Sequence, residues 1–418
     1  MVDNDGLTQV DERRRPSTSE VIACPDCGLE QGLPVFTHAQ VAVCARCERM
    51  LAGPATGRIG PPLALALTAA TLLLPATVVP LFRVSDYGAH RDGLLVSSAA
   101  ALWRDGFPSL GVLVALFAIL VPLLFLALLI WVLGRLLADR RAGIGPVFRW
   151  VQHLRPWVMI EVYLVGGFVA YNRIKVVANV DVDVGGWCLL GAALSLLVAL
   201  TQLDERTVWQ RLRPQQPTAS GAATLACTLC DLIVHATSEG RHCPRCAAIL
   251  HLRKPYSRQR TLALVLAGFL LYIPANTLPV LTTVRFGYEE DNTILSGVRE
   301  LIENDLWPLA LIVFAASIVL PLVKLCGLSW MLWATRRHSP RLLVARTRLY
   351  RIIDMVGRWS NIDIFSVAVL VTVLQFGSLT AVHAGAGLVA FAAVVIITML
   401  ATSVFDPRLM WDARRTHG

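Results

Sequence analysis

Two neighbouring stretches decide the fold: CTLCDLIVHATSEGRHCPRC at residues 227–246 and TLALVLAGFLLYIPANTLPVLTTV at residues 261–284. The first holds two C-x-x-C pairs separated by 12 residues, and the second contains no Asp, Glu, Lys or Arg. Four thiolates from two such turns can surround one tetrahedral metal ion. About 20 uncharged residues are enough for a helix to cross the hydrocarbon layer. Together the stretches predict a small metal-bound ribbon in front of a membrane span.

The same order of features occurs earlier in the chain. Two C-x-x-C pairs separated by 16 residues precede the uncharged run 59–82. Further along, three other motifs recur at matching places, which indicates a tandem duplication. They are Pro75-Ala-Thr-Val-Val-Pro80 with Pro274-Ala-Asn-Thr-Leu-Pro279, Val121-Pro-Leu123 with Leu320-Pro-Leu322, and Trp157-Val-Met-Ile-Glu161 with Trp359-Ser-Asn-Ile-Asp363. For each proline pair, a kink that shapes packing and a break that lines a cavity are both open.

The cysteine pairs predict two structural Zn²⁺ sites, because four protein ligands leave no open position for a substrate water. The ligands are Cys24, Cys27, Cys44 and Cys47 in one ribbon and Cys227, Cys230, Cys243 and Cys246 in the other. Rubredoxin-like iron or redox-active dithiols are the alternative, and they would make the chain a membrane redox protein.

Other runs with few or no charges predict further spans, giving eight in all. They are 59–82, 106–134, 156–172, 184–203, 261–284, 306–335 and two within 364–405. The sequence thus predicts an all-α polytopic membrane protein with two tandem four-helix transmembrane repeats, each preceded by a small cytosolic zinc ribbon. The expected parts are a disordered tail (1–20), ribbon 1 (21–52), repeat 1 (59–205), ribbon 2 (222–252), repeat 2 (259–406) and a cytosolic tail (407–418).

Basic residues predict the orientation, because Lys and Arg near helix ends stay on the cytoplasmic side. With both termini cytosolic, few arginines lie outside: Arg83, Arg91, Arg104, Arg285 and Arg299. Residues 1–58 hold charged clusters and no apolar core of signal-peptide type, so we expect them in the cytosol.

The composition narrows the function. Of 418 residues, 55% are hydrophobic and 16% are charged, which is too apolar for a set of soluble domains. There is no G-x-x-x-x-G-K-[ST] phosphate-binding motif and no evident catalytic constellation. We therefore expect a membrane protein that is not an enzyme and has no nucleic-acid partner.

Ionisable residues inside the predicted spans are candidates for a polar transport path, because a charge at membrane depth costs at least about 2.5 kcal/mol without a partner or water. The candidates, including two polar residues beside a proline, are Glu161, Arg173, Lys175, Asn276, Thr277, Lys324 and Asp363. Helix-end anchoring for the carboxylates and snorkelling for the cations are the alternatives.

Several of these motifs resemble the paraquat-inducible protein A family of bacterial inner-membrane proteins. The resemblance covers roughly residues 20–412 and rests on the duplicated ribbons and four segments. The segments are Pro156-Trp-Val-Met-Ile-Glu-Val-Tyr163, Val169-Ala-Tyr171 with Arg173, Gly357-Arg-Trp-Ser-Asn-Ile-Asp-Ile-Phe365 and Phe405-Asp-Pro-Arg-Leu-Met-Trp-Asp412. A departure is Asn172-Arg173-Ile-Lys175, where the family pattern leads us to expect one Lys.

The resemblance implies a multi-pass inner-membrane subunit of a phospholipid transport system in a Gram-negative envelope. It also implies a periplasmic MCE-domain protein as partner, whose hydrophobic tunnel receives or delivers the lipid. The helical units are expected to be similar to tetraspanin-like four-helix bundles with an extracytoplasmic elaboration at 94–103 and 293–306. Besides the redox alternative, a purely structural anchor for the periplasmic partner stays open.

Overall fold

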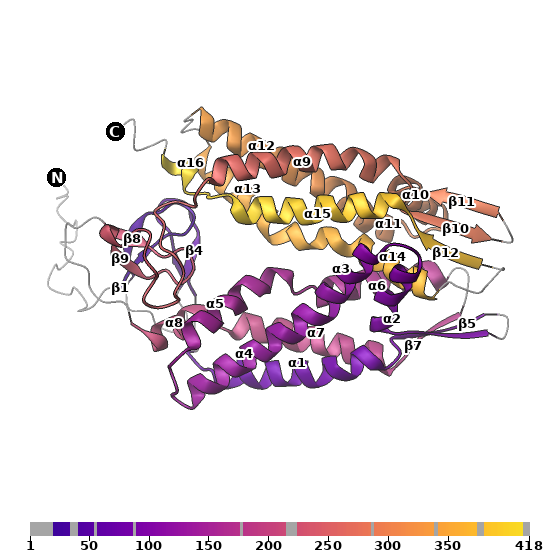
Figure 1. Cartoon of the computed structure of the whole chain (residues 1–418), viewed down its shortest axis with the longest axis horizontal. Helices are drawn as coiled ribbons and strands as arrows, with labels where there is room; N and C mark the ends of the chain where they lie inside the picture. The colour runs from indigo at the N-terminus through magenta and orange to yellow at the C-terminus, as the bar shows by residue number, and fades with distance from the viewer. Residues whose placement is uncertain are drawn as a thin grey trace, which may run out of the picture.

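The computed structural model describes residues 20–33, 41–53, 57–86, 89–175, 179–214, 224–285, 288–337, 342–373 and 380–412. Small hairpins gather at one end of the long molecule, helices fill the middle, and two small sheets lie at the other end (Figure 1). We call these ends the ribbon end and the sheet end.

Short antiparallel hairpins form the two ribbons. Ribbon 1 contains β1 (Glu20–Ala23) paired with β2 (Glu30–Leu33) and β3 (Ala42–Val43) paired with β4 (Met50–Ala52). Ribbon 2 contains β8 (Thr224–Ala226) paired with β9 (Ile233–His235), the short helix η3 (Ala236–Ser238) and a bridge between His242 and Ile249.

The helices repeat in the same order in both halves. Repeat 1 contains α1 (Gly60–Val78), α2 (Leu95–Arg104), α3 (Pro108–Ala115), η1 (Leu116–Leu120), α4 (Val121–Leu137), α5 (Ile144–Leu154), η2 (Arg155–Trp157), α6 (Ile160–Lys175), α7 (Val184–Gln202) and α8 (Glu205–Leu212). Repeat 2 contains α9 (Ser257–Thr277), α10 (Ile294–Glu303), α11 (Trp307–Phe314), η4 (Ala315–Val319), α12 (Leu320–Arg336), α13 (Leu343–Val356), η5 (Gly357–Asn361), α14 (Ile362–Val373), α15 (Ala386–Val404) and α16 (Leu409–Asp412).

Seven helical segments are long and apolar enough to cross a membrane within the described ranges, so the chain is a multi-pass membrane protein. Three lie in repeat 1 and four in repeat 2: Gly60–Val78, Pro108–Leu137, Val184–Gln202, Ser257–Thr277, Trp307–Arg336, Leu343–Val373 and Ala386–Val404. Repeat 1 has no segment equivalent to Leu343–Val373 of repeat 2 among these seven. The equivalent helix there is α6, whose 16 residues are separated from α5 by η2 and two non-helical residues. The count of eight spans stays a prediction, which requires α6 to cross as well.

The proline pairs end helices instead of breaking them in mid-membrane. Helix α1 continues through Pro75, and α9 continues through Pro274. The last turns close with a bond from Val79 N to Pro75 O (2.8 Å) and from Leu278 N to Pro274 O (3.0 Å). The second proline of each pair then leads into a strand, because proline cannot continue the helical hydrogen bonds.

Two three-stranded antiparallel sheets correct the all-α expectation, although the protein is mostly helical. One sheet has the order β6 (Ala89–Gly93), β5 (Phe82–Asp86), β7 (Asn179–Val182). The other has the order β11 (Tyr288–Asn292), β10 (Leu281–Arg285), β12 (Thr380–Ala384). The hairpins are short and polar, so the search for apolar runs did not detect them. The expected elaborations at 94–103 and 293–306 coincide with α2 and α10, and α2 ends one residue later, at Arg104.

The first and last long helices of each repeat pack together, α1 on α7 and α9 on α15. The third helices instead pack on each other across the repeats, α6 on α14. The Tyr163 and Phe365 rings, at equivalent positions of these helices, lie 5.4 Å apart between centroids. The two repeats therefore share one continuous core along α6 and α14.

Each ribbon packs against the repeat that does not follow it in the sequence. The ribbon 1 cysteines belong to a buried cluster with Tyr350 of α13 and Trp411 of α16, both in repeat 2. Ribbon 2 lies against α5 of repeat 1, where Arg149 Nη1 donates to Ala247 O at 2.9 Å. A Cβ on Gly145 would lie 2.1 Å from Arg245 O, so only glycine allows this approach.

Candidate functional site

Four turns with the same backbone geometry position the cysteines. In each turn the first cysteine N–H bonds to the carbonyl five residues later, and its carbonyl accepts from the N–H four residues later. The residue directly after the second cysteine has a positive φ: Gly28 (69°), Glu48 (58°), Asp231 (54°) and Ala247 (59°). Two such turns face each other in each ribbon and turn all four sulfurs inward.

The sulfur geometry fits a metal ion. All four Sγ atoms within each cluster lie within 4.8 Å of one another, and all eight cysteines are buried. The closest Sγ pairs are 3.5 Å apart in ribbon 1 and 3.6 Å apart in ribbon 2. A tetrahedral ion about 2.3 Å from each sulfur separates them by about 3.8 Å, so each cluster can bind an ion.

Arginines support the ribbon 1 cluster from outside. Arg351 of α13 donates to Cys47 Sγ at 3.1 Å, to Cys47 O at 2.9 Å and to Asp26 at 2.6 Å. Asp26 is buried and also pairs with Arg49. A guanidinium beside a thiolate stabilises its negative charge, so α13 of repeat 2 supports the sulfur atoms of this cluster.

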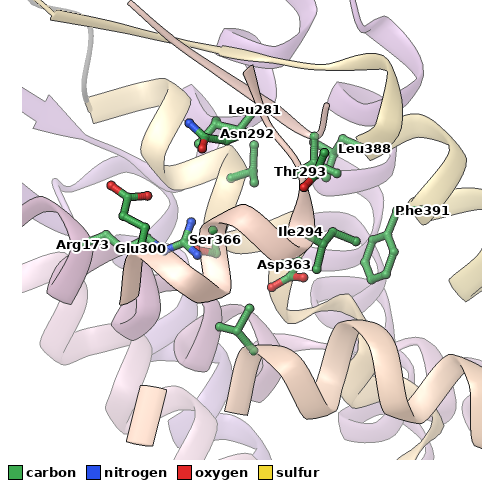
Figure 2. Close-up of a pocket in the computed structure, with 14 residues that line it drawn as sticks. Arg173, Leu281, Asn292, Thr293, Ile294, Glu300, Asp363, Ser366, Leu388 and Phe391 are labelled. Carbon is green, nitrogen blue, oxygen red and sulfur yellow. The ribbon is translucent and has the colours of Figure 1, made fainter. Parts of the chain in front are cut away.

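A second candidate site is a charged cavity between the repeats at the sheet end. Its volume is about 30 Å³, and its lining includes Arg173 of α6, Glu300 of α10, and Asp363 and Ser366 of α14 (Figure 2). The structure thus gathers two predicted residues, Arg173 and Asp363, although they belong to different repeats. A cavity of this size holds about one water molecule.

Arg173 crosses the repeat boundary beside a glycine of α10. A Cβ on Gly297 would lie 3.2 Å from Arg173 Nη2. Within the described residues, Arg173 Nε and Ser366 Oγ are buried and have no hydrogen-bond partner. The cavity therefore contains polar groups that a bound water or a polar ligand would satisfy.

Glu161 also contacts the other repeat, from the first turn of α6. Its carboxylate lies 3.1 Å from Arg358 Nη1 in η5, and both side chains are about one-third exposed. The equivalent carboxylates Glu161 and Asp363 thus both face arginine across the repeat boundary. One arginine comes from each repeat.

Lys324 of α12 is 2% exposed and lies inside repeat 2. Its Nζ donates to Gly357 O at 2.7 Å and to Ser360 Oγ at 3.0 Å. In the described part of the chain no carboxylate bonds to it, so neutral oxygens alone solvate the amine. The equivalent residue of repeat 1 is Phe125, which is also fully buried.

The other predicted path residues lie elsewhere. Asn276 and Thr277 bond to carbonyls of their own helix, Tyr272 O and Ile273 O. Lys175 is exposed, with Nζ 5.9 Å from the centroid of the Tyr171 ring. None of these three residues lines the charged cavity.

Sequence reasoning did not find Glu300, Ser366 or Arg358. Glu300 lies on the amphipathic helix α10 outside the spans, where a charge needs no explanation. Ser366 is uncharged, so a search for membrane charges does not detect it. Arg358 was visible as part of the Gly357–Phe365 segment, but its partner in another repeat was not.

Comparison with known proteins places these features in context. A family model described as "Paraquat-inducible protein A" matches residues 59–213 and 258–415. "Intermembrane transport protein PqiA" of Escherichia coli is 32% identical over 404 residues, which cover 94% of this chain and 95% of the relative. "Lipophilic envelope-spanning tunnel protein A" of Escherichia coli is 30% identical, with coverage of 94% and 91%. A "Probable intermembrane transport protein" of Haemophilus influenzae is 24% identical, with coverage of 94% and 96%. No solved structure matches.

Proposed function

The chain belongs to the paraquat-inducible protein A family, and from this premise we propose that it is the inner-membrane subunit of a phospholipid transport system. It exchanges lipid with a periplasmic MCE-domain protein whose tunnel leads toward the outer membrane of a Gram-negative bacterium. The relatives are named as transport proteins and not as enzymes.

The observation that carries this proposal is the extent of the similarity. It runs over 94% of this chain and at least 91% of each relative, so both ribbons and both repeats have counterparts. Similarity limited to one ribbon or one repeat would not support the same function for the whole chain. Here the similarity extends over nearly the full length of relatives whose names refer to intermembrane transport or to an envelope-spanning tunnel.

The proposed orientation places the ribbon end in the cytosol and the sheet end in the periplasm. The asymmetry of arginines supports it, and so does the position of the described chain ends, since β1 and α16 both lie at the ribbon end (Figure 1). Helix α6 then crosses as the eighth span, and both termini are cytosolic. A cysteine introduced at Glu290 reacts with an external thiol reagent in this orientation, whereas one at Arg211 does not.

The ions in the ribbons are proposed to be Zn²⁺ with a structural role. Four buried thiolates per site leave no coordination position for a substrate. Elemental analysis of protein purified without added metal then finds two zinc ions per chain. Ferric-thiolate absorbance would instead support the membrane redox alternative.

A polar path through the helices is the proposed route for coupling. Its best-supported members are Arg173, Asp363 and Lys324, because they lie inside the helical body and face polar groups. Glu161 joins it through Arg358. Lys175, Asn276 and Thr277 are kept as proposed members on the sequence argument alone.

A transfer assay tests the proposed function. Proteoliposomes containing the full chain and a fluorescent phospholipid are mixed with the soluble part of the MCE-domain partner, and lipid bound to the partner is measured. We expect more transfer than from empty liposomes, and less from Asp363→Asn at matched protein level. Equal transfer with and without the chain would contradict the proposal.

A further inference from the structure

Repeat 1 contains a second cavity, much larger than the charged one. It lies between α6, α7 and the strands β5 and β7, and its volume is about 410 Å³. This lies within the range of about 300–1,000 Å³ that is typical of small-molecule sites. The lining includes Phe82, Tyr163, Phe168, Tyr171 and Trp187, and no lining residue carries a charge.

The cavity occupies the position in repeat 1 that the charged cavity occupies in repeat 2. The register is fixed at α7 and α15: a Cβ on Gly185 would meet Val79 O and Pro80 O, and a Cβ on Gly387 would meet Leu278 O and Pro279 O. Leu189 and Phe391 are therefore equivalent. Each lines the cavity of its own repeat.

Two glycines explain why the space in repeat 1 is larger. Gly167 corresponds to Val369, and Gly186 corresponds to Leu388. Both glycines line the repeat 1 cavity, whereas Val369 and Leu388 are buried in repeat 2. The extra side-chain atoms occupy volume in repeat 2 that remains open in repeat 1.

The position of the cavity limits what can fill it. Phe168 is 59% exposed and Trp187 is 63% exposed, on α6 and α7, so their exposed faces contact the hydrocarbon of a membrane. Apolar cavities stay dry, so water does not fill this one well. Acyl chains are the apolar molecules that surround it.

A cation lies beside this cavity at the sheet end of α6. Lys175 is exposed and its Nζ is 5.9 Å from the centroid of Tyr171, a lining residue. Lysine, tyrosine and tryptophan commonly lie at the level of lipid headgroups. An ammonium there is complementary to a phosphate whose acyl chain enters the cavity.

We propose that the repeat 1 cavity binds one acyl chain of a membrane phospholipid, with the lipid phosphate against Lys175. This deepens the proposed function and rests on it for the identity of the lipid as cargo. The site lies at the sheet end, so it holds the lipid on the side where the periplasmic partner is proposed to dock. The charged cavity of repeat 2 is then free for a different role.

Photocrosslinking tests the site. The full chain is placed in nanodiscs that contain a phospholipid with a diazirine near the middle of one acyl chain, because Phe168 lies about 10 Å along α6 from Lys175. We expect adducts concentrated on α6 and α7 near Phe168 and Trp187. Gly167→Leu fills the cavity, since a Cβ there already lies 3.5 Å from the Phe82 ring, and we expect adducts to fall on the order of tenfold. Gly134→Leu is the matched control, because a Cβ on Gly134 would meet nothing within 4 Å.

A second pair of measurements tests the headgroup contact. Lys175→Gln is expected to reduce labelling by the phospholipid several-fold and to leave labelling by the corresponding photoreactive diacylglycerol unchanged. Three results would overturn the proposal. They are labelling of Gly167→Leu at the wild-type level, adducts spread evenly over the lipid-facing helices, and adducts formed only on the scaffold protein of the nanodisc. Labelling concerns binding alone, so loss of transfer with normal labelling would count against the proposed function and not against this site.

Discussion

The two repeats place opposite chemistry at equivalent positions of the same scaffold. In repeat 1, Phe125 is buried and the cavity beside α6 is large and apolar. In repeat 2, Lys324 takes the place of Phe125, and the cavity beside α14 is small and charged. The helices around both cavities have the same order and the same proline turns.

This difference indicates that the duplication determines the arrangement of the helices, whereas differences at single positions determine the chemistry of each half. Leu164 in repeat 1 corresponds to Ser366 in repeat 2, and each lines the cavity of its own half. Arg173 is an exception, because it belongs to repeat 1 but lines the cavity of repeat 2. The halves therefore depend on each other for the charged site.

The ends of the two repeats that face the ribbons are also equivalent, but their tryptophans pack against different partners. Each repeat ends in the pattern D-x-R-x-x-W, from Asp204 to Trp209 and from Asp406 to Trp411. Trp209 packs on Phe148 at 4.9 Å between centroids, and Trp411 lies beneath Arg46 of ribbon 1 at 5.7 Å. The structural unit is thus a repeat with the ribbon that packs on its end, and ribbon 1 closes repeat 2 from the opposite end of the sequence.

The largest expected effect comes from removing one of the proposed metal ligands. Metal binding supplies about 10–16 kcal/mol to small zinc modules, so Cys24→Ser should unfold ribbon 1. Because ribbon 1 packs on α13 and α16, we expect faster amide hydrogen exchange in residues 343–356 and 405–412. Residues 144–154 of repeat 1 should stay protected.

The mirror experiment is Cys243→Ser in ribbon 2. It should increase exchange in residues 144–154 and 205–212 and spare α13, since Arg149 and Gly145 contact this ribbon. Both variants are compared at equal zinc supply. Faster exchange in repeat 1 of Cys24→Ser would contradict the packing of each ribbon against the repeat that does not follow it in the sequence.

A smaller effect is expected where the two D-x-R-x-x-W patterns differ in burial. Asp406 is 1% exposed and bonds to Arg408 Nε and Nη2, both at 3.0 Å. Asp406→Asn leaves a buried guanidinium without its counter-charge and with one acceptor oxygen fewer, and we expect a loss of about 3 kcal/mol in thermal unfolding. Asp204→Asn is the control: Asp204 caps α8, and Asn is as good a cap. Equal losses would contradict this contrast.

The pH dependence sharpens the same contrast. Burial alone would raise the pKa of Asp406, but the bonds from Arg408 hold the pKa below its usual value. A lowered pKa means that the stabilisation is complete above about pH 4 and is lost as the pH falls further. The difference in stability between the wild type and Asp406→Asn should therefore be constant from pH 8 to pH 5 and shrink below pH 4. A difference that shrank between pH 7 and pH 5 would identify another titrating group.

Local patterns were sufficient to predict much of this fold. Cysteine spacing gives the ribbons, because the ligands of one ion lie in two short turns. Missing charges give the long spans, because lipid excludes them. The packing of each ribbon against the repeat that does not follow it could not be predicted. It depends on contacts between residues as distant in the sequence as Asp26 and Arg351, which no local pattern indicates.

The candidate site was less accessible to sequence reasoning for the same physical reason. Charges at membrane depth marked Arg173, Lys324 and Asp363, but their partners are neutral or come from another repeat. Gly357 O and Ser360 Oγ, which bind Lys324, have no signature in the sequence. The large cavity arises from two glycines. Glycine occurs in membrane helices for many other reasons, so these two did not indicate a cavity.

Replacing Lys324 tests whether its charge is functional. Lys324→Met keeps a similar shape and removes a buried amine that has only neutral partners, so we expect stability to change by less than about 1 kcal/mol or to increase. If the amine belongs to the transport path, lipid transfer should fall about tenfold, which corresponds to about 1.4 kcal/mol. Phe125→Met at the equivalent position is the control and should keep transfer. Normal transfer by Lys324→Met at wild-type abundance would remove Lys324 from the path.

The smallest effect is expected at the pair Glu161 and Arg358, which joins the repeats. Glu161 and Arg358 are each about one-third exposed, and such pairs contribute about 0.2–1 kcal/mol because water competes for the charges. Glu161→Gln should therefore lower thermal stability only slightly. The double reversal Glu161→Arg with Arg358→Glu should recover stability lost in either single reversal, because like charges then no longer face each other. Recovery of stability without recovery of transfer would show that Glu161 has a role in the path beyond joining the repeats. Full recovery of both would assign this carboxylate to packing alone and leave Asp363, its equivalent in the charged cavity, as the specialised member of the pair.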